Sequence, residues 1–176
     1  MKVINLYGAS GSGKSVLRAD LFSFYKKKGY KVEEVTEFAK DLAYENHGLL
    51  KACDFNSQVI ILGEQLRRVE RLRKEVDISI SDSPLDIGCI YLESNSKILQ
   101  NLTGLIMKDD DLFSVRVRND TIFHQGYGRI QKDKEDNMIY ESRLDTLMKY
   151  DFHVWRSAYD RNFKELIERI KSKWEI

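Results

Sequence analysis

The stretch GASGSGKS at residues 8–15 follows an apolar run in which Val3, Ile4 and Leu6 predict a short buried strand. It fits the spacing G-x-x-x-x-G-K-[ST] of a phosphate-binding P-loop. Glycines at three positions let backbone N–H groups approach an anion closely. An amphipathic helix is expected directly after the loop, with its positive N-terminal end facing the same anion. The motif in this strand–loop–helix context predicts a nucleotide-phosphate site; the alternative is a glycine-rich turn with an incidental lysine.

Two side chains of this loop have expected chemical roles. The Lys14 ammonium can reach the β- and γ-phosphates of a nucleotide, and the Ser15 hydroxyl can ligate Mg²⁺. ATP and Mg²⁺ are therefore the expected cofactors. The predicted phosphate-binding residues are Gly8, Ser10, Gly11, Ser12, Gly13, Lys14 and Ser15.

Length and charge limit the classes of protein to which the chain can belong. Its 176 residues are enough for one α/β domain with a substantial core, and no linker or repeat divides it. A net charge of +1 gives no global attraction to nucleic acid or an anionic membrane. Cys53 and Cys89 are isolated and are expected to be reduced packing residues. With no apolar run of membrane-spanning length and no signal-peptide pattern, we expect a cytoplasmic protein without membrane contact.

An acidic residue, Glu37, ends the next strand candidate. Residues 31–38 read KVEEVTEF, and the strand–helix–strand order favours a right-handed parallel crossover. Ligands of open α/β sheets bind at the carboxyl ends of the strands, where Glu37 is expected to lie. The alternative is a solvated acid at the start of a helix.

A second acid, Asp82, follows the third strand candidate. The strongest helical pattern, over residues 54–75, precedes it and carries an arginine-rich face expected to be solvated; the alternative is that one of these arginines reaches into the site. Val76, Ile78 and Ile80 then alternate as in a strand, and Pro84 prevents further regular pairing. In P-loop proteins an acid at this place serves Mg²⁺. The alternative for Asp82 is a turn cap.

Basic residues gather after the fourth strand candidate, residues 112–117. Arg116 and Arg118 lie at its end, and a glycine-containing stretch over 119–136 carries Arg129. In a phosphoryl-transfer enzyme such a segment would cover the phosphates and exclude water. Arginine there would neutralise charge on the transferred group; the alternative is an ordinary surface loop. The preceding acidic turn, residues 109–111, lacks calcium-loop spacing and is expected to be solvated.

The order of elements predicts an α/β P-loop NTPase fold, a three-layer sandwich in a single domain. About five parallel strands should form the sheet, with helices on both faces and a short lid-like segment near 119–136. The P-loop strand should be central, and the strand that ends at Asp82 should lie beside it.

Several stretches together resemble small P-loop kinases. They are GASGSGKS, TEFAKDLAYE, SISDSP and VRVRNDTIFHQGYGRIQ. The chain looks most like the AAA-like ATP-binding family that includes the nicotinamide riboside kinase domain and many phage nucleoside, nucleotide and DNA-base kinases. The resemblance implies that Glu37 contacts or deprotonates an acceptor hydroxyl, that Asp82 serves Mg²⁺ and that Arg129 belongs to the lid. Asp82-Ser83-Pro84 replaces the Glu-Arg-Ser of deoxynucleoside kinases and removes one expected arginine.

Three functional hypotheses follow. The first is an ATP- and Mg²⁺-dependent phosphotransferase acting on a small nucleoside or nucleotide, with Lys14, Glu37, Arg116, Arg118 and Arg129 as catalytic residues. The second keeps this chemistry but places the acceptor hydroxyl on a modified base, such as a hydroxymethylpyrimidine, in phage DNA. The third is a nucleotide-gated ATPase or regulatory module. Acceptor identity, donor base and oligomeric state stay open at this point.

Overall fold

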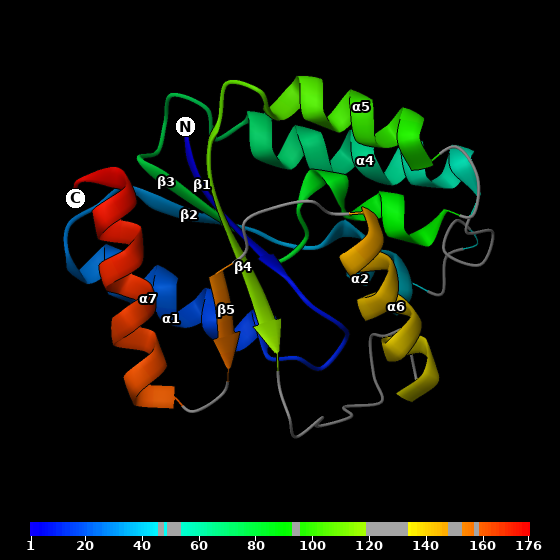
Figure 1. Ribbon diagram of the computed structural model, residues 1–176. Helices are drawn as coiled ribbons and strands as arrows, with labels where there is room; N and C mark the ends of the chain where they lie inside the picture. The colour runs from blue at the N-terminus through cyan, green and yellow to red at the C-terminus, as the bar shows by residue number, and fades with distance from the viewer. Residues whose placement is uncertain (46–47, 49–53, 93–95, 119–133, 148–152, 157–158) are drawn as a thin grey trace.

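The computed structural model describes residues 1–45, 48, 54–92, 96–118, 134–147, 153–156 and 159–176. Within these residues the chain alternates between strands and helices from one end to the other (Figure 1). No helix in this part is both long enough and apolar enough to cross a membrane.

A five-stranded sheet forms the centre of the molecule. Its strands in chain order are β1 (Lys2–Tyr7), β2 (Val32–Val35), β3 (Ile78–Ser81), β4 (Asp111–Arg118) and β5 (His153–Arg156). Their order in space is β2-β3-β1-β4-β5, and every neighbouring pair is parallel. The expected central place of the P-loop strand, with the strand before Asp82 beside it, is confirmed. Parallel strands place all five carboxyl ends at one edge.

Helices cover both faces of the sheet and connect its strands. They are α1 (Lys14–Lys27), α2 (Phe38–Tyr44), α4 (Phe55–Glu70), the 3-10 helix η1 (Leu85–Tyr91), α5 (Ser96–Met107), α6 (Lys134–Leu147) and α7 (Tyr159–Trp174). Figure 1 shows α1 and α7 on one side of the sheet and α4, α5 and α6 on the other. The predicted α/β three-layer fold is confirmed.

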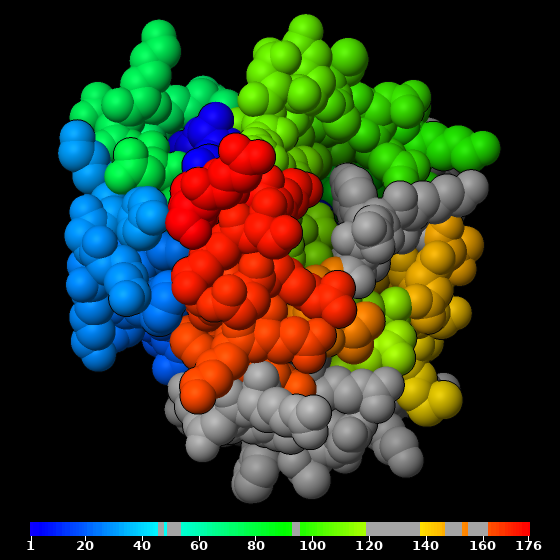
Figure 2. Space-filling model, turned by 60° about the vertical axis from the view of Figure 1, so that its left-hand side comes forward, coloured from blue at the N-terminus to red at the C-terminus, as the bar shows by residue number. Residues whose placement is uncertain are grey.

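Each face of the sheet has its own apolar core. The core under α1 and α7 is made by the buried residues Ile4, Leu6, Leu17, Leu21, Ile80, Val115, Leu166 and Ile170. Figure 2 shows α7, in red, lying along this side of the molecule beside the blue N-terminal part of the chain. The opposite core, under α4, η1, α5 and α6, contains Tyr7, Leu62, Val69, Leu85, Cys89, Leu99, Tyr140 and Leu144. Burial raises the pKa of Cys89 to about 12, so this cysteine packs as a protonated thiol, as expected.

Some element boundaries differ from those expected. The strands expected over 31–38 and 76–83 are four residues each, β2 and β3, so Glu37 and Asp82 lie in the turns that follow them. After the turn with Asp82, the chain forms the 3-10 helix η1. Of the lid-like segment 119–136, residues 119–133 lie outside the described residues, and α6 begins at Lys134.

The acidic turn at residues 109–111 is not uniformly solvated, and for Asp110 that expectation is wrong. Its side chain is 2% exposed and accepts hydrogen bonds from Arg73 Nη1 and Nη2 at 2.5 and 2.9 Å. Arg73 follows α4, so its paired carboxylate ties the end of that helix to the start of β4. A buried carboxylate is stable here because a cation pairs with it.

Candidate functional site

The P-loop wraps around the carboxyl end of β1 in a conformation that requires glycine. Gly8 has φ +150°, and a Cβ at that position would lie 2.4 Å from the carbonyl oxygen of Val117 on β4. Gly13 has φ 99°, in the left-handed region that favours glycine, directly before α1. The loop therefore rests on β4 and turns straight into the helix, as residues 8–15 predict.

The N-terminus of α1 is prepared for an anion. No side chain caps Gly13, and the first turn of α1 contains no acidic residue. Lys14 Nζ donates to the carbonyl oxygens of Gly8 at 2.6 Å and Ala9 at 3.0 Å, which holds the ammonium over the loop. The Ser12 hydroxyl is buried and has no hydrogen-bond partner among the residues that the structure describes. Uncapped helix amides beside a fixed cation are the features that bind phosphate.

Ser15 and Asp82, the two predicted metal ligands, meet at the edge of the sheet. Ser15 Oγ donates to Asp82 Oδ2 at 3.3 Å, although the two residues are 67 positions apart. Asp82 is 7% exposed, and its second oxygen, Oδ1, is buried without a hydrogen-bond partner in the described part of the chain. The carboxylate thus has an unsatisfied acceptor beside the P-loop serine.

This donor set fits Mg²⁺. The ion takes one or two protein oxygens and completes its shell with substrate phosphates and water. Among the residues placed by the structure, no cluster of three or more His, Cys, Asp or Glu side chains could hold a metal unaided. Ser15 and Asp82 are therefore the residues that would hold Mg²⁺, with phosphate oxygens supplying further ligands.

Arg18 joins this pair, a contact that the sequence analysis missed. Its Nη1 donates to Asp82 Oδ2 at 2.7 Å, and its Nε donates to Glu34 Oε1 at 3.0 Å. Burial alone would lower the pKa of Arg18, but the charges of Asp82 and Glu34 outweigh burial and raise it. The guanidinium is therefore charged. The only sequence signal is its position three residues after Ser15, on the same side of α1.

Glu37 is the N-cap residue of α2, and side chains of α4 fix the backbone on both sides of it. Gln65 Nε2 donates to the Thr36 carbonyl at 3.2 Å, and the Phe38 N–H donates to Gln65 Oε1 at 3.1 Å. Gln65 is 2% exposed. Both hydrogen-bonding groups of one buried amide are thus used to hold the turn that carries Glu37.

Arg68 adds a second clamp to the same turn. Its Nη1 donates to Thr36 Oγ1 at 3.0 Å, and its Nη2 donates to Asp41 at 2.6 Å. The guanidinium also lies over the Phe38 ring, 5.1 Å from the ring centroid. The arginine face of the helix is therefore only partly solvated, because Arg68 binds the segment after β2. The sequence left open that one arginine of this face reaches the site but did not single out Arg68, and it gave no signal for Gln65.

Tyr140 of α6 lies against the first glycine of the P-loop. It is 5% exposed, and burial raises the pKa of its hydroxyl well above the usual value. Tyr91, at a ring-centroid distance of 6.2 Å, and Glu37 act in the same direction, while a hydrogen bond with the Gly8 backbone opposes them. One phenol therefore contacts the first glycine of the loop and lies within electrostatic range of Glu37.

The predicted arginine Arg116 is engaged by two carboxylates of α6. It is 6% exposed and donates to Glu141 Oε2 through Nε at 3.2 Å and Nη2 at 2.6 Å. Its Nη1 also pairs with Asp145. The other oxygen of Glu141 accepts the Ala9 N–H at 3.0 Å, so Arg116 is joined to the P-loop through one carboxylate.

The remaining predicted arginines differ in position. Arg118 ends β4, and its Nε is buried without a hydrogen-bond partner. With Arg116, it lowers the pKa of Asp145. Arg129 lies outside the described residues. Ser10 occupies the partly exposed turn of the P-loop.

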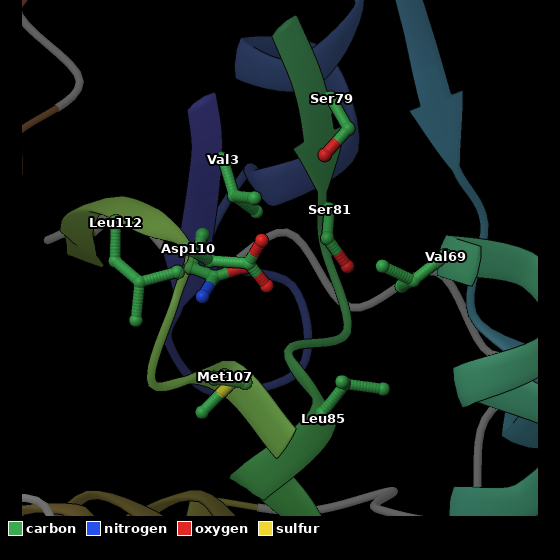
Figure 3. A pocket seen from close by; sticks show the side chains of 9 residues that line it. Val3, Val69, Ser79, Ser81, Leu85, Met107, Asp110 and Leu112 are labelled. Carbon is green, nitrogen blue, oxygen red and sulfur yellow. The ribbon is translucent and has the colours of Figure 1, made fainter. Parts of the chain in front are cut away.

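A small cavity lies elsewhere, on the α4 and α5 side of the sheet. Figure 3 shows its lining of Val3, Val69, Ser79, Ser81, Leu85, Met107, Asp110 and Leu112, to which Asn5 also contributes. None of these residues belongs to the P-loop or contacts Asp82 in the hydrogen bonds above. The cavity is therefore separate from the candidate site, which is the open edge at the strand ends.

Comparisons with known proteins agree with this geometry. No protein-family model and no curated protein sequence matches the chain. Among solved structures, thymidylate kinase from Ehrlichia chaffeensis matches with a TM-score of 0.66 and 16% identity, over 97% of each chain. Deoxyadenosine kinase from M. mycoides with bound dATP matches with a TM-score of 0.54 and 18% identity, over 99% of this chain and 100% of that one.

A third similar structure is the APS kinase CysC of Mycobacterium tuberculosis, as a Cys556Ala mutant. The TM-score is 0.51 and the identity 16%, over 99% of this chain and 97% of that one. The chain has the fold of P-loop kinases. At these identities the likeness concerns the fold, and the narrower resemblance to the nicotinamide riboside kinase family stays a prediction.

Proposed function

We propose that the protein is an ATP- and Mg²⁺-dependent kinase that transfers the terminal phosphate to a small nucleoside or nucleotide. The observation that carries the proposal is the place of Glu37. Glu37 is the N-cap residue of α2 and follows β2 at the same edge of the sheet where the P-loop follows β1, and it belongs to neither the P-loop nor the metal pair. A carboxylate so placed suits an acceptor hydroxyl, whereas a nucleotide-binding switch would not need it.

The donor side is formed by the P-loop and α1. Backbone N–H groups at the start of α1 and the Lys14 ammonium bind the phosphates. Ser15 and Asp82 would hold Mg²⁺, which neutralises charge on the phosphates when bound. The left-handed backbone of Gly11 and Gly13 leads the loop directly into α1, an arrangement in which these donors need little reorganisation during the reaction.

The acceptor side depends on Glu37. Its carboxylate takes the proton of the acceptor hydroxyl as the acceptor oxygen forms a bond to the γ-phosphorus. The bond between that phosphorus and the β–γ bridging oxygen breaks, and ADP leaves. Gln65 and Arg68 hold the turn, which keeps the carboxylate oriented.

We assign the stabilisation of negative charge on the transferring phosphoryl group to arginines at the end of β4 and in the segment that follows it. Arg116 and Arg118 lie at that strand end, and Arg129 is kept as the third candidate. For Arg116 to contact a phosphate, its guanidinium must share or exchange the carboxylates of Glu141 and Asp145. A nucleoside or nucleotide acceptor is supported by the thymidylate and deoxyadenosine kinases of similar fold.

An acceptor panel tests the proposal. ADP release by the purified protein is measured with ATP and Mg²⁺, alone and with nucleosides, nucleoside monophosphates, adenylyl sulfate or hydroxymethylated DNA. We expect one small acceptor class to raise the rate at least about tenfold, with a phosphorylated product seen by mass spectrometry. Stimulation by DNA alone would move the acceptor to a base within DNA. ATP turnover that no acceptor changes would refute the kinase assignment.

A further inference from the structure

Arg18 lies among the proposed metal ligands although its residue type does not suit a metal site. It follows Ser15 by three positions on α1, and its side chain is 17% exposed. The guanidinium contacts Asp82 at 2.7 Å and Glu34 at 3.0 Å, and so joins α1, the end of β2 and the turn after β3. A cation is thus built into the place where the site would receive another cation.

The two oxygens of Asp82 are in different states. Oδ2 accepts from Arg18 and from Ser15, while Oδ1 is buried and has no hydrogen-bond partner among the described residues. Arg18 therefore supplies the charge that a buried carboxylate needs, without satisfying the whole group. The oxygen left over is the one suited to a further ligand.

The electrostatic consequence follows from the signs of the charges. In this partly buried setting, the guanidinium repels a divalent ion that approaches Asp82 more strongly than it would in water. Arg18 offsets part of the charge of Asp82, with which it pairs at 2.7 Å against 3.0 Å for Glu34, so a lone Mg²⁺ gains less from this carboxylate. A nucleotide triphosphate adds several negative charges at the N-terminus of α1, and these offset the repulsion.

We propose that Arg18 is a positioning residue that makes metal binding at Ser15 and Asp82 dependent on the nucleotide. This inference rests on the metal site of the proposed function. In the protein without nucleotide, Arg18 is the counter-ion of Asp82 and keeps a lone divalent ion away. Metal and triphosphate are consequently bound together rather than in sequence.

The test measures metal binding without turnover. Mn²⁺ suits the oxygen ligands that bind Mg²⁺, and its binding is followed by electron paramagnetic resonance. We expect the wild type to bind Mn²⁺ weakly at this site unless the ATP analogue AMP-PNP is present. Arg18→Met, which keeps the aliphatic stem, should bind Mn²⁺ without nucleotide at least about tenfold more tightly than the wild type.

Three further variants identify the cause. Arg18→Lys restores the charge and should behave as the wild type does. Arg18→Met combined with Asp82→Asn should lose the gain, because the metal-binding carboxylate is gone. Arg67→Met is the matched control, since Arg67 is an exposed, ion-paired arginine on α4, away from the P-loop; it should leave Mn²⁺ binding unchanged.

Several outcomes would overturn the inference. The first is an equal Mn²⁺ affinity, without nucleotide, of the wild type and Arg18→Met. The second is a higher affinity of Arg18→Met that persists when Asp82→Asn is added. The third is an Mn²⁺ affinity of Arg18→Lys as high as that of Arg18→Met. If Arg18→Met fails to fold, Arg18→Gln is measured in the same way. No acceptor is present, so a failed acceptor panel leaves these results decisive. If Asp82→Asn alone leaves Mn²⁺·AMP-PNP binding unchanged, the metal site is refuted, and this inference with it.

Discussion

The donor side and the acceptor side of the candidate site are held in different ways. The P-loop is fixed by its own backbone, since Lys14 bonds to two carbonyls of the loop and Gly13 leads directly into α1. The turn with Glu37 is fixed by Gln65 and Arg68, side chains 27 to 32 positions away in sequence. A contiguous motif therefore specifies one half of the site, and tertiary contacts specify the other.

The largest expected effect is on the donor side. Lys14→Ala should reduce turnover by about 1,000-fold or more, because it removes a positioned cation from the phosphates. Steady-state ADP release measures it. Lys26→Ala, on the same helix but exposed and paired with Glu33, is the control and should leave the rate unchanged. Similar rates for the two variants would remove Lys14 from the mechanism.

On the acceptor side, Glu37→Gln should lower kcat by about 100- to 1,000-fold, because the amide cannot accept the acceptor proton. The affinity for ATP, measured by calorimetry, should stay as in the wild type. Glu45→Gln, an exposed acid at the other end of α2, serves as the control. An unchanged kcat would show that Glu37 is not the base.

Gln65→Leu tests the hydrogen bonds that hold the turn with Glu37, while the Glu37 carboxylate itself is kept. The substitution leaves the Phe38 N–H without its Gln65 partner and the Thr36 carbonyl with only the 3.3 Å hydrogen bond from Arg68 Nη1 among the described residues, which should cost about 1–3 kcal/mol of unfolding free energy. The turn with Glu37 loses its fixed orientation, so kcat should fall about tenfold.

Urea unfolding and ATP calorimetry complete this experiment. ATP affinity should not change, because the donor side is held by its own backbone. Asn56→Leu, an exposed amide on the same helix, should alter stability by no more than about 0.5 kcal/mol. A loss of ATP affinity in Gln65→Leu would mean that the two sides are not independent.

The sequence predicted where most residues assigned to the donor side lie, and little of what supports the turn with Glu37. Residues 8–15 and Asp82 could be predicted because a strand, a loop and a helix in contiguous order leave few alternatives. The contacts of Gln65, Arg68 and Arg18 could not be predicted. They depend on which face of each helix packs against the edge of the sheet. The expectation for Asp110 failed for the same reason: a turn sequence does not show that Arg73 will pack against it.

The smallest expected effect concerns pH and the helix that supports the acceptor side. Hydrogen bonds from Arg67 and Arg68 lower the pKa of Glu64 from 4.5 to about 2. Because the folded pKa is the lower one, this stabilisation is complete above about pH 4.5 and is lost as the pH falls towards 2.

Glu64→Gln should therefore reduce stability at pH 7 and not at pH 2. The difference should be at most about 1 kcal/mol, because the carboxylate is partly exposed and salt screens it. Urea midpoints of both proteins at the two pH values measure it. A stability difference that is the same at both pH values would exclude the ionisation of Glu64 as its cause.

The hydrogen bond from Ala9 to Glu141 has a consequence for observing the protein in solution. The amide of Ala9 lies in the phosphate loop, whereas its acceptor lies on α6, far along the chain, and that acceptor also holds Arg116. Because this amide shares a carboxylate with a buried arginine, its NMR signal should be sensitive to the position of that carboxylate. The chemical shift and the hydrogen-exchange rate of the Ala9 amide would therefore report a movement of α6 relative to the loop, without a probe attached to either element.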